Sequence, residues 1–567
     1  MTDSNLDPML HDGAGIRNTL RPVMLIGFQE QANLGLGYLA ATLRREGYRV
    51  VVFDFESERE EILAAAKDLA PVLIGFSLIF QFYIDRFGSL IRYLRANGVD
   101  CHFTMGGHFP SLSSEHTLKL VPELDSVVRF EGEATLLELV DCLSAGRDWG
   151  DVAGLAYSID GAIRLTTPRP LVNDLDALPY PERSAGRTTA ILGRRAMPLL
   201  ASRGCIRTCS FCSIHVFYRT APGKVVRTRQ PLKVVEEMRH LLEQQGVTIF
   251  LFQDDDFPVF GPVWQRWARE FAAELHRARL VGRVIWKINC RADAVDARLF
   301  AELKHAGLFM VYMGLESGSE EGLTTLHKQI TAEQNLRAVT TLKELGIMFE
   351  FGFMLFDPST TFESVAANLR FLRAIVADGA APATFCRMIP YDGTPIKAEL
   401  ARSGRLKGDI CHPDYDFLDP TVDAFFQALN QIVHVSGWIH GVGALTVQLQ
   451  YIKGEVAVMS ALFPALERFE QYREQVRTIT AGANAVLFDV IEQVMAAHRD
   501  HSSHRWTPQA VKAACEGFQR RLLDQRTAFI SRNQSVMLEA LGLREEESRA
   551  KDGGAASDSL GELQLQE

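Results

Sequence analysis

Three cysteines within eight residues are the side chains of this sequence best suited to chemistry. They lie in the segment Ser202-Arg-Gly-Cys205-Ile-Arg-Thr-Cys209-Ser-Phe-Cys212. Three thiolates from one loop can bind three irons of a [4Fe–4S] cluster, which leaves the fourth iron free to bind a small molecule. The segment follows an apolar run that predicts a strand, and active sites of α/β folds collect at the carboxyl ends of strands.

A structural zinc site is the alternative, because His215 lies three residues after Cys212 and would complete four ligands. Such sites are usually built from two separated pairs, whereas these residues are all local. A disulfide is disfavoured by the odd total of nine cysteines and by the reducing cytosol. The other six are scattered singly, as small buried residues: Cys101, Cys142, Cys290, Cys386, Cys411 and Cys515.

The bulk composition indicates a globular protein of the cytoplasm. The 567 residues suggest about three domains. We expect no membrane span, because no run of about 18 apolar residues occurs, and no secretory signal, because the first twenty residues are polar. The net charge of −10 provides no general basic field, which argues against a nucleic-acid partner.

The elements before residue 150 alternate between short apolar strands and helices, which predicts a Rossmann-like, doubly wound parallel sheet. The predicted helices are Leu34–Glu46 and Arg86–Ala96. The predicted strands are Val23–Phe28, Tyr48–Phe53, Val72–Leu78, His102–Met105 and Val127–Phe130.

A second alternation starts near residue 191 and predicts six strand–helix units, which suit a partial barrel and are too few for an eight-fold one. The predicted strands are Pro198–Ser202, Thr248–Gln253, Val284–Asn289, Met310–Leu315, Phe349–Leu355 and Thr384–Pro390. Strand signals then fade, and helices are predicted at Pro420–His434, Ala457–Glu474, Asn484–His498 and Pro508–Leu541.

These patterns predict an α/β protein divided into six parts. We expect a flexible arm at 1–20, a Rossmann-like domain at 21–150, a linker at 151–190, a barrel core at 191–415, a mostly helical domain at 416–544 and a disordered acidic tail at 545–567.

The spacing C-x3-C-x2-C, with the aromatic Phe211 before the last cysteine, resembles the signature loop of the radical S-adenosylmethionine (SAM) enzymes. Within 191–400, three segments after predicted strands resemble later motifs of that family, and Lys328 lies where a family lysine often follows. The segments are Gln253-Asp-Asp-Asp-Phe257, Asn289-Cys-Arg291-Ala-Asp293 and Gly314-Leu-Glu316-Ser-Gly318. The resemblance implies a [4Fe–4S] cluster on Cys205, Cys209 and Cys212, and SAM binding by Phe211, Gln253, Asp254, Asp255, Arg291, Gly314, Glu316 and Ser317.

Each of these motifs also has an ordinary structural interpretation. Asp254 to Asp256 suit a solvated turn or a helix N-cap, and Glu316 suits the first turn of a helix. The chemistry that the resemblance implies is one-electron cleavage of SAM to methionine and a 5′-deoxyadenosyl radical, which takes hydrogen from an unactivated carbon. The protein then has to orient the donor and exclude water.

A Rossmann-like domain ahead of such a core resembles the cobalamin-binding class of radical SAM enzymes. Small residues at strand ends allow a nucleotide tail to lie against the backbone. The resemblance implies cobalamin binding by Gly35, Gly37, Ser77, Leu78, Gly106, Gly107, His108, Glu131 and Gly132. A nicotinamide site is disfavoured, since no G-x-G-x-x-G follows the first strand, and a domain without ligand is the other alternative.

The first loop departs from the cobalamin pattern Asp-x-His-x-x-Gly. It contains Gln29-Glu-Gln-Ala-Asn-Leu-Gly35, and no histidine occurs between His11 and His102. No histidine of that loop can therefore be the lower ligand of cobalt. The departure does not exclude cobalamin, because the class that the chain resembles often lacks this histidine.

The resemblance predicts a cobalamin-dependent radical SAM methyltransferase that acts on an unactivated carbon of a small metabolite or peptide. It implies a flavodoxin- or ferredoxin-like one-electron reductant as partner. Two alternatives stay open: a cyclase, oxidase or rearrangement enzyme with the same cofactors, and a non-catalytic cobalamin or iron–sulfur sensor. Trp438, His440 and Tyr451 are either pocket residues of the helical region or part of its core.

Overall fold

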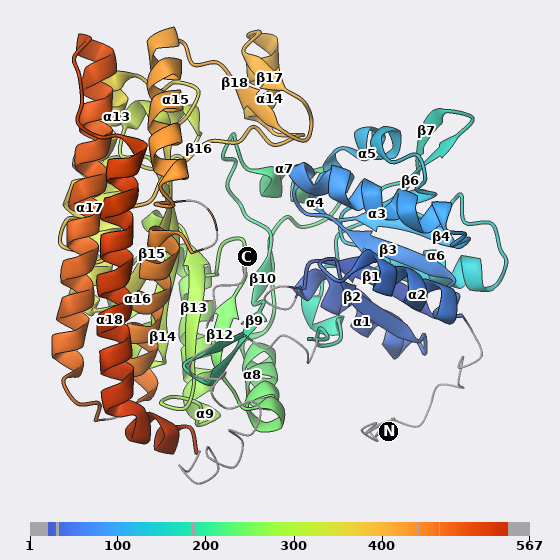
Figure 1. Cartoon of the computed structure of the whole chain (residues 1–567). Helices are drawn as coiled ribbons and strands as arrows, with labels where there is room; N and C mark the ends of the chain where they lie inside the picture. The colour runs from blue at the N-terminus through green and yellow to red at the C-terminus, as the bar shows by residue number, and fades with distance from the viewer. Residues whose placement is uncertain are drawn as a thin grey trace. The chain divides into compact units, whose positions relative to one another are not determined.

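The computed structural model describes residues 21–29, 33–183, 189–439, 441, 443–463 and 465–542. Two compact units form, one from the chain up to Val172 with two short later segments, and one from most of the remainder. Figure 1 shows the elements of both. The predicted arm, the predicted tail and His440 lie outside the described residues.

The first unit is a seven-stranded sheet in the order β2-β1-β3-β4-β5-β6-β7. Its first five strands are parallel, and Figure 1 shows helices on both of its faces, as the doubly wound prediction requires. The strands are β1 (Val23–Gly27), β2 (Val50–Asp54), β3 (Leu73–Ser77), β4 (His102–Gly106), β5 (Ser126–Val128), β6 (Leu155–Ile159) and β7 (Ala162–Leu165). The helices are α1 (Leu34–Arg45), α2 (Arg59–Leu69), α3 (Ile84–Ala96), α4 (His108–Leu112), α5 (Ser114–Leu120) and α6 (Glu133–Ser144).

The segment expected to be a linker at 151–190 adds two antiparallel strands, β6 and β7, to this sheet. β6 is buried at its first three residues and exposed at its last two, and β7 is mostly exposed. Edge strands this short, with apolar residues at exposed positions, give a weak periodic signal, which explains their absence from the predicted strands.

The second unit contains a sheet in the order β16-β15-β14-β13-β12-β9-β8. Six of these strands, β9 and β12 to β16, are parallel, and β8 is an antiparallel edge. This confirms the partial barrel. The strands are β8 (Thr189–Ile191), β9 (Arg194–Leu199), β12 (Val247–Phe252), β13 (Ile285–Cys290), β14 (Leu308–Glu316), β15 (Met348–Phe356) and β16 (Cys386–Arg387), with the small pairs β10 (Ser202–Arg203), β11 (Arg227–Thr228) and β17 (Leu406–Gly408), β18 (Pro413–Tyr415).

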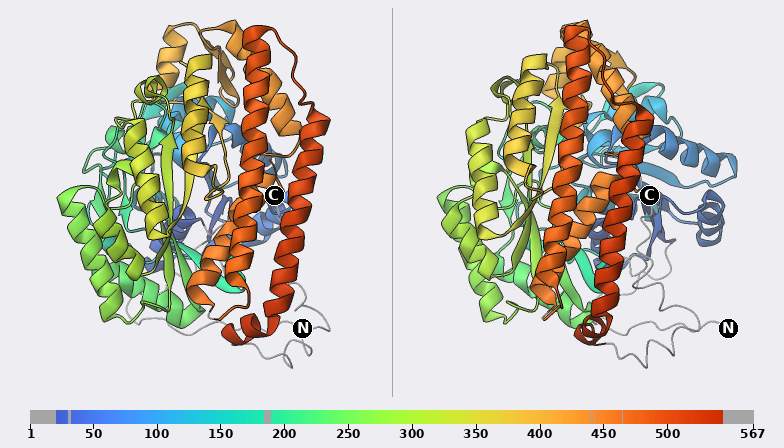
Figure 2. Two further views of the ribbon diagram at one scale, coloured as in Figure 1. Left: turned by 90° about the vertical axis from the view of Figure 1, so that its left-hand side faces the viewer. Right: turned by 60° about the vertical axis from the view of Figure 1, so that its left-hand side comes forward.

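Helices follow the barrel strands and continue into the C-terminal region. Those of the barrel are α7 (Ser213–Thr220), α8 (Pro231–Gln245), α9 (Gly261–Arg277), α10 (Ala297–His305), α11 (Glu320–Thr325), α12 (Ala332–Leu345), α13 (Phe362–Val376) and α14 (Pro395–Arg402). Four more, α15 (Pro420–Val435), α16 (Leu445–Leu462), α17 (Phe469–Asp500) and α18 (Pro508–Ala540), share one hydrophobic core with the sheet. Figure 2 shows α17 and α18 side by side along the barrel.

One predicted helix, Ala457–Glu474, is wrong. α16 ends at Leu462, and the next residue, Phe463, is extended with φ −121°. The sequence continues with Pro464, and a proline disfavours helical geometry in the residue before it. The helix resumes as α17 at Phe469.

α17 is the one helix among the described residues that could cross a membrane by length and composition, with a mean hydropathy of 1.2 over its most apolar window. Of that window, 56% is buried inside the protein. α17 packs against α13, α15 and α18, as a core helix does.

Candidate functional site

The three cysteines lie in the loop between β10 and α7, at the carboxyl end of β9. α7 begins at Ser213, directly after Cys212. Gly204 precedes Cys205 with φ +92°, and a Cβ there would lie 1.9 Å from the carbonyl oxygen of Val225. Only glycine therefore permits the turn that presents the first thiol.

The surroundings of Cys205 and Cys212 favour the protonated thiol unless positive charge is supplied. Burial raises the pKa of Cys205 to about 12 and that of Cys212 to about 11. The negative charge of Asp256 also raises the pKa of Cys205, because Asp256 Oδ2 lies 4.0 Å from Cys205 Sγ. Iron binds the thiolate and reverses this preference, so the loop suits a metal cluster.

The position of His215 argues against the zinc alternative. Its Nε2 lies 2.9 Å from the backbone oxygen of Cys209. Within the described ranges, no three His, Cys, Asp or Glu side chains are arranged to hold one metal ion. A four-iron cluster needs no such convergence, because each thiolate binds a different iron. The loop therefore fits the cluster better than a single zinc ion.

Asp254 and Asp255, predicted to bind SAM, hold the cysteine loop to the end of β12. The Asp254 carboxylate accepts hydrogen bonds from the Ala201 N–H at 3.2 Å and the Ser202 hydroxyl at 2.5 Å. Burial raises the pKa of Asp254 to about 7. Asp255 Oδ2 accepts from the Gly204 N–H at 2.9 Å. The neighbouring Gln253 side chain is exposed.

Arg291 follows β13 and joins the cysteine loop to two further segments. Its Nη1 lies 3.8 Å from Cys209 Sγ, and its Nη2 donates to the Lys328 carbonyl at 2.7 Å. Its Nε binds Asp293 at 3.0 Å, and Arg207 of the cysteine loop binds the same carboxylate. The guanidinium is thus fixed with positive charge beside a cluster thiol.

Glu316 ends β14 in a conformation that is rare outside glycine, with φ +66°. Its Oε1 lies 3.1 Å from Lys328 Nζ, and the two side chains are 11% and 6% exposed. A Cβ at Gly314 would lie 2.3 Å from that oxygen, so a side chain at position 314 would displace the Glu316 carboxylate. Strain of this kind concentrates at functional sites.

The remaining predicted SAM residues have structural partners. Ser317 is fully buried, and its hydroxyl donates to Asn368 Oδ1 at 3.0 Å, which fixes the turn after β14. Phe211 is half-buried against the hydrophobic core. The cysteine loop follows β9, Arg291 follows β13, and Glu316 ends β14. These strands belong to one sheet and are parallel, so the three features lie at its carboxyl edge.

Sequence reasoning missed three polar residues of the barrel strands, Lys287, Tyr312 and Glu350. Tyr312 of β14 lies opposite Asn289 of β13 and Glu350 of β15, and Lys287 donates to Asn289 Oδ1 at 2.5 Å. A Cβ at Gly352 would lie 2.8 Å from Tyr312 Oη and 3.5 Å from Glu316 Oε2. This polar row therefore borders Glu316. Lone polar residues at alternate positions of apolar strands were its signal.

The residues predicted to bind cobalamin lie at the carboxyl edge of the other sheet. They follow β1, β3, β4 and β5, which are neighbours, and ligands of such folds bind at this edge. Gly107 has φ +112°, and a Cβ there would lie 2.1 Å from the Leu78 oxygen. The set consists of Gly35 and Gly37 in α1, Ser77 and Leu78, Gly106 to His108, and Glu131 and Gly132.

Some of these residues also serve the fold itself. A Cβ at Gly37 would lie 2.2 Å from the backbone oxygen of Glu182, so its lack of a side chain admits that segment. Glu131 Oε2 accepts from the Val172 N–H at 2.6 Å. Burial lowers the pKa of His108 to about 4, so its imidazole is neutral at neutral pH.

Two exposed apolar side chains follow β3 at this edge. Ile79 and Phe80 follow Leu78 directly and are 45% and 44% exposed. Adjacent exposed apolar side chains of this size mark binding surfaces. The backbone at Gly107 and the exposed side chains of Ile79 and Phe80 thus belong to the same edge of the sheet.

Comparison with known proteins gives two family matches. The model described as "B12 binding domain" matches residues 27–140, and that of the "Radical SAM superfamily" matches residues 199–372. These ranges contain the two edges described above.

Individual relatives and solved structures agree with this division. An uncharacterized methyltransferase of Pyrococcus horikoshii is 28% identical over 401 residues, 69% of this chain and 82% of its own. The anaerobic magnesium-protoporphyrin IX monomethyl ester cyclase of Rubrivivax gelatinosus is 30% identical over 353 residues, 60% of this chain and 61% of its own. The structure of the cobalamin-dependent S-adenosylmethionine radical enzyme OxsB has a TM-score of 0.63 at 19% identity, covering 92% of this chain and 83% of that chain.

Proposed function

The chain belongs to the cobalamin-binding radical SAM enzymes, and from that premise we propose that it transfers a methyl group to an unactivated carbon of a small metabolite or peptide. Its cofactors are a [4Fe–4S] cluster, SAM and cobalamin. Bound together, they supply a 5′-deoxyadenosyl radical and a transferable methyl group.

We assign the cluster to Cys205, Cys209 and Cys212. Arg291, 3.8 Å from Cys209 Sγ, offsets thiolate charge, and positive charge beside a cluster favours its reduction. Asp254 and Asp255 hold the loop in place through Ala201, Ser202 and Gly204. The backbone that precedes Cys205 is therefore fixed to the end of β12.

We assign SAM to the space beside Glu316, where Gly314 and Gly352 leave the strands without side chains. Glu316 and Lys328 offer an acceptor and a donor of opposite charge within 3.1 Å. A zwitterionic amino acid group suits such a pair, since each of its charges finds a partner. Phe211, Gln253 and Ser317 are proposed to complete the SAM site.

We assign cobalamin to the carboxyl edge of the first sheet, with its nucleotide tail along Ser77, Leu78, Gly106, Gly107 and Gly132, and its ring over Ile79 and Phe80. The tail requires backbone without side chains, and Gly107 supplies it between β4 and α4. The remaining proposed contacts are Gly35, Gly37, His108 and Glu131.

Methyl transfer is favoured by one observation above the others. The methyltransferase relative is matched over 82% of its length, whereas the cyclase relative is matched over 61%. The chain thus resembles the methyltransferase over most of the length of that protein.

The second candidate is a cyclisation, oxidation or rearrangement without methyl transfer. The cyclase relative favours it, because its identity of 30% is slightly higher than the 28% of the methyltransferase. Both candidates use the same cysteine loop and differ in what happens to the substrate radical.

One anaerobic assay separates the candidates. Protein reconstituted with iron, sulfide and cobalamin is incubated with SAM, a one-electron reductant and candidate substrates, and the products are measured by mass spectrometry. Methyl transfer yields S-adenosylhomocysteine together with 5′-deoxyadenosine, whereas rearrangement yields 5′-deoxyadenosine without S-adenosylhomocysteine. No 5′-deoxyadenosine from protein with an intact cluster would contradict both and favour a sensor.

A further inference from the structure

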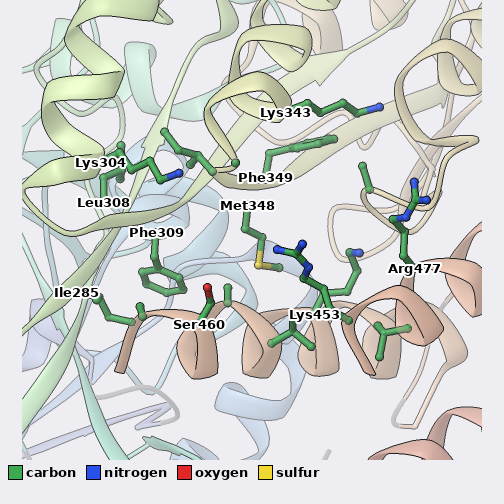
Figure 3. A pocket seen from close by; sticks show the side chains of 18 of the residues that line it. Ile285, Lys304, Leu308, Phe309, Lys343, Met348, Phe349, Lys453, Ser460 and Arg477 are labelled. Atoms are coloured by element: carbon green, nitrogen blue, oxygen red, sulfur yellow. The ribbon is translucent and has the colours of Figure 1, made fainter. Parts of the chain in front are cut away.

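A cavity of about 660 Å³ opens at the end of the barrel opposite the cysteine loop. It is lined by the first residues of β13, β14 and β15 and by α16 and α17. Its volume lies in the range of small-molecule sites, about 300–1,000 Å³. We call it the basal pocket (Figure 3).

Apolar side chains form much of the wall of the basal pocket. Phe309, Met348, Phe349 and Val456 line it. Figure 3 shows Phe309 and Met348 above the α16 residue Ser460, whose hydroxyl points toward them. An apolar body of a ligand would be desolvated here, with one hydroxyl for polar contact.

The charged lining of the basal pocket has an excess of cations. Lys304, Lys343, Lys453, Arg473 and Arg477 line it together with only two acidic residues, Asp378 and Glu474. Those two are engaged: Asp378 binds Lys343 at 2.9 Å, and Glu474 binds Arg477 at 2.8 Å.

Two ammonium groups of the pocket donate to backbone carbonyls. Lys453 Nζ donates to the Gly379 oxygen at 2.8 Å, and Lys304 Nζ donates to the Leu345 oxygen. Figure 3 shows Lys304 and Lys453 on opposite sides of Met348. An ammonium has three donors, so each group retains donors for an anion in addition to its carbonyl partner.

Burial of Lys453 also disfavours its charged form. Burial lowers the pKa of Lys453 to about 8, against a rise due to Asp378. A buried ammonium is stabilised when an anion binds beside it. A perturbed lysine in a cavity of suitable size is a mark of a binding site.

We propose that the basal pocket binds a small amphiphilic anion, with its apolar body against Phe309 and Met348 and its carboxylate, sulfonate or phosphate head at Lys453. The site is separate from the cluster, since Ile285 at the pocket and Arg291 beside Cys209 are at opposite ends of β13. Six strand residues span about 20 Å. This site goes beyond the proposed catalytic function.

Calorimetric titration of the holoenzyme, loaded with cluster, cobalamin and SAM, tests the proposal with three probes. Decanoate, with both head and body, is expected to bind once per chain. Decanol, with the body alone, and inorganic phosphate, with the head alone, are expected to bind at least about tenfold more weakly. Equal binding of decanol or of phosphate would contradict an amphiphilic site.

Variants show whether decanoate binds in the basal pocket. Lys453→Met keeps the length of the side chain without its charge and should raise the Kd about tenfold. Ser460→Leu should weaken binding by filling the cavity, and it adds a test independent of charge. Lys512→Met, on an exposed lysine of α18, is the matched control and should leave Kd unchanged. If both pocket variants bound decanoate with the same Kd as the wild-type protein, the proposal would be overturned.

Discussion

In each of the two sheets, the candidate residues lie at the carboxyl ends of the parallel strands, but the two sets of residues differ in chemistry. At the barrel edge, charged side chains bind one another, as Arg291 binds Asp293 and Glu316 binds Lys328. At the edge of the first sheet, Gly107 lies against the backbone of Leu78, and Phe80, two residues after Leu78, is exposed. The barrel edge therefore depends on charge and geometry, and the first depends on the absence of bulk.

This contrast teaches how each site can be damaged. A substitution that keeps the shape but removes charge should harm the barrel edge and spare the other sheet. A substitution that adds one carbon at Gly107 should harm the first sheet and spare the barrel edge. The predictions below test this separation.

The largest effect is expected from Cys209→Ala. Its thiol is buried beside Arg291, and a cluster with two protein ligands has no secure place in the loop. SAM cleavage should fall below detection, measured as 5′-deoxyadenosine by mass spectrometry, while the corrinoid absorbance of the purified protein is retained. Cys515→Ala, a buried cysteine of α18, is the control. Loss of corrinoid together with cleavage would break the comparison.

The next effect is expected from Glu316→Gln, which leaves Lys328 buried without a carboxylate. Removing one partner of a buried ion pair costs about 3–5 kcal/mol, and we expect about 3 kcal/mol, because the amide oxygen still accepts a hydrogen bond. Chemical denaturation should show the loss, and the KM for SAM should rise.

Glu333→Gln is the matched control for this pair. Glu333 binds Arg337 with side chains 75% and 65% exposed, and exposed pairs contribute about 0–1 kcal/mol. If both variants lost equal stability, the Glu316–Lys328 pair would have no special role at the barrel edge.

Much of this architecture could be predicted from the sequence, because apolar strands alternate with helices. β1, β4, β12 and β13 lie within a few residues of their predicted bounds. The strands β6 and β7 were not predicted, since their exposed positions give little periodicity. Motif spacing identified the cysteines, Arg291 and Glu316.

What the sequence could not provide is which side chains meet. The carboxylate of Asp254, whose predicted role in SAM binding stays a prediction, accepts hydrogen bonds from Ala201 and Ser202, more than 50 positions earlier. The Tyr312 row depends on the register between β13, β14 and β15. Such register follows from tertiary packing, and periodicity alone does not determine it.

At the first sheet, Gly107→Ala should act through bulk. Its Cβ would lie 2.1 Å from the Leu78 oxygen, and overpacking costs about 1–3 kcal/mol. We expect lower corrinoid content and a lower unfolding temperature, with cluster content unchanged. Gly98→Ala is the control, because Gly98 also has positive φ, +81°, but nothing lies within 4 Å of its Cβ position. Equal effects would assign the loss to backbone strain instead of crowding.

The smallest effect is expected from Phe80→Ser, which removes apolar surface where the corrinoid ring is proposed to lie. Phe80 is 44% exposed, so the variant should lose little stability without corrinoid. Burial of part of an aromatic side chain contributes about 1 kcal/mol, which corresponds to a roughly fivefold higher Kd for cobalamin. Equilibrium dialysis against cobalamin measures it. Leu523→Ser, 58% exposed on α18, removes apolar surface elsewhere and should leave the Kd unchanged. An unchanged Kd in Phe80→Ser would move the ring away from Phe80, and the first sheet would then depend on its glycines alone.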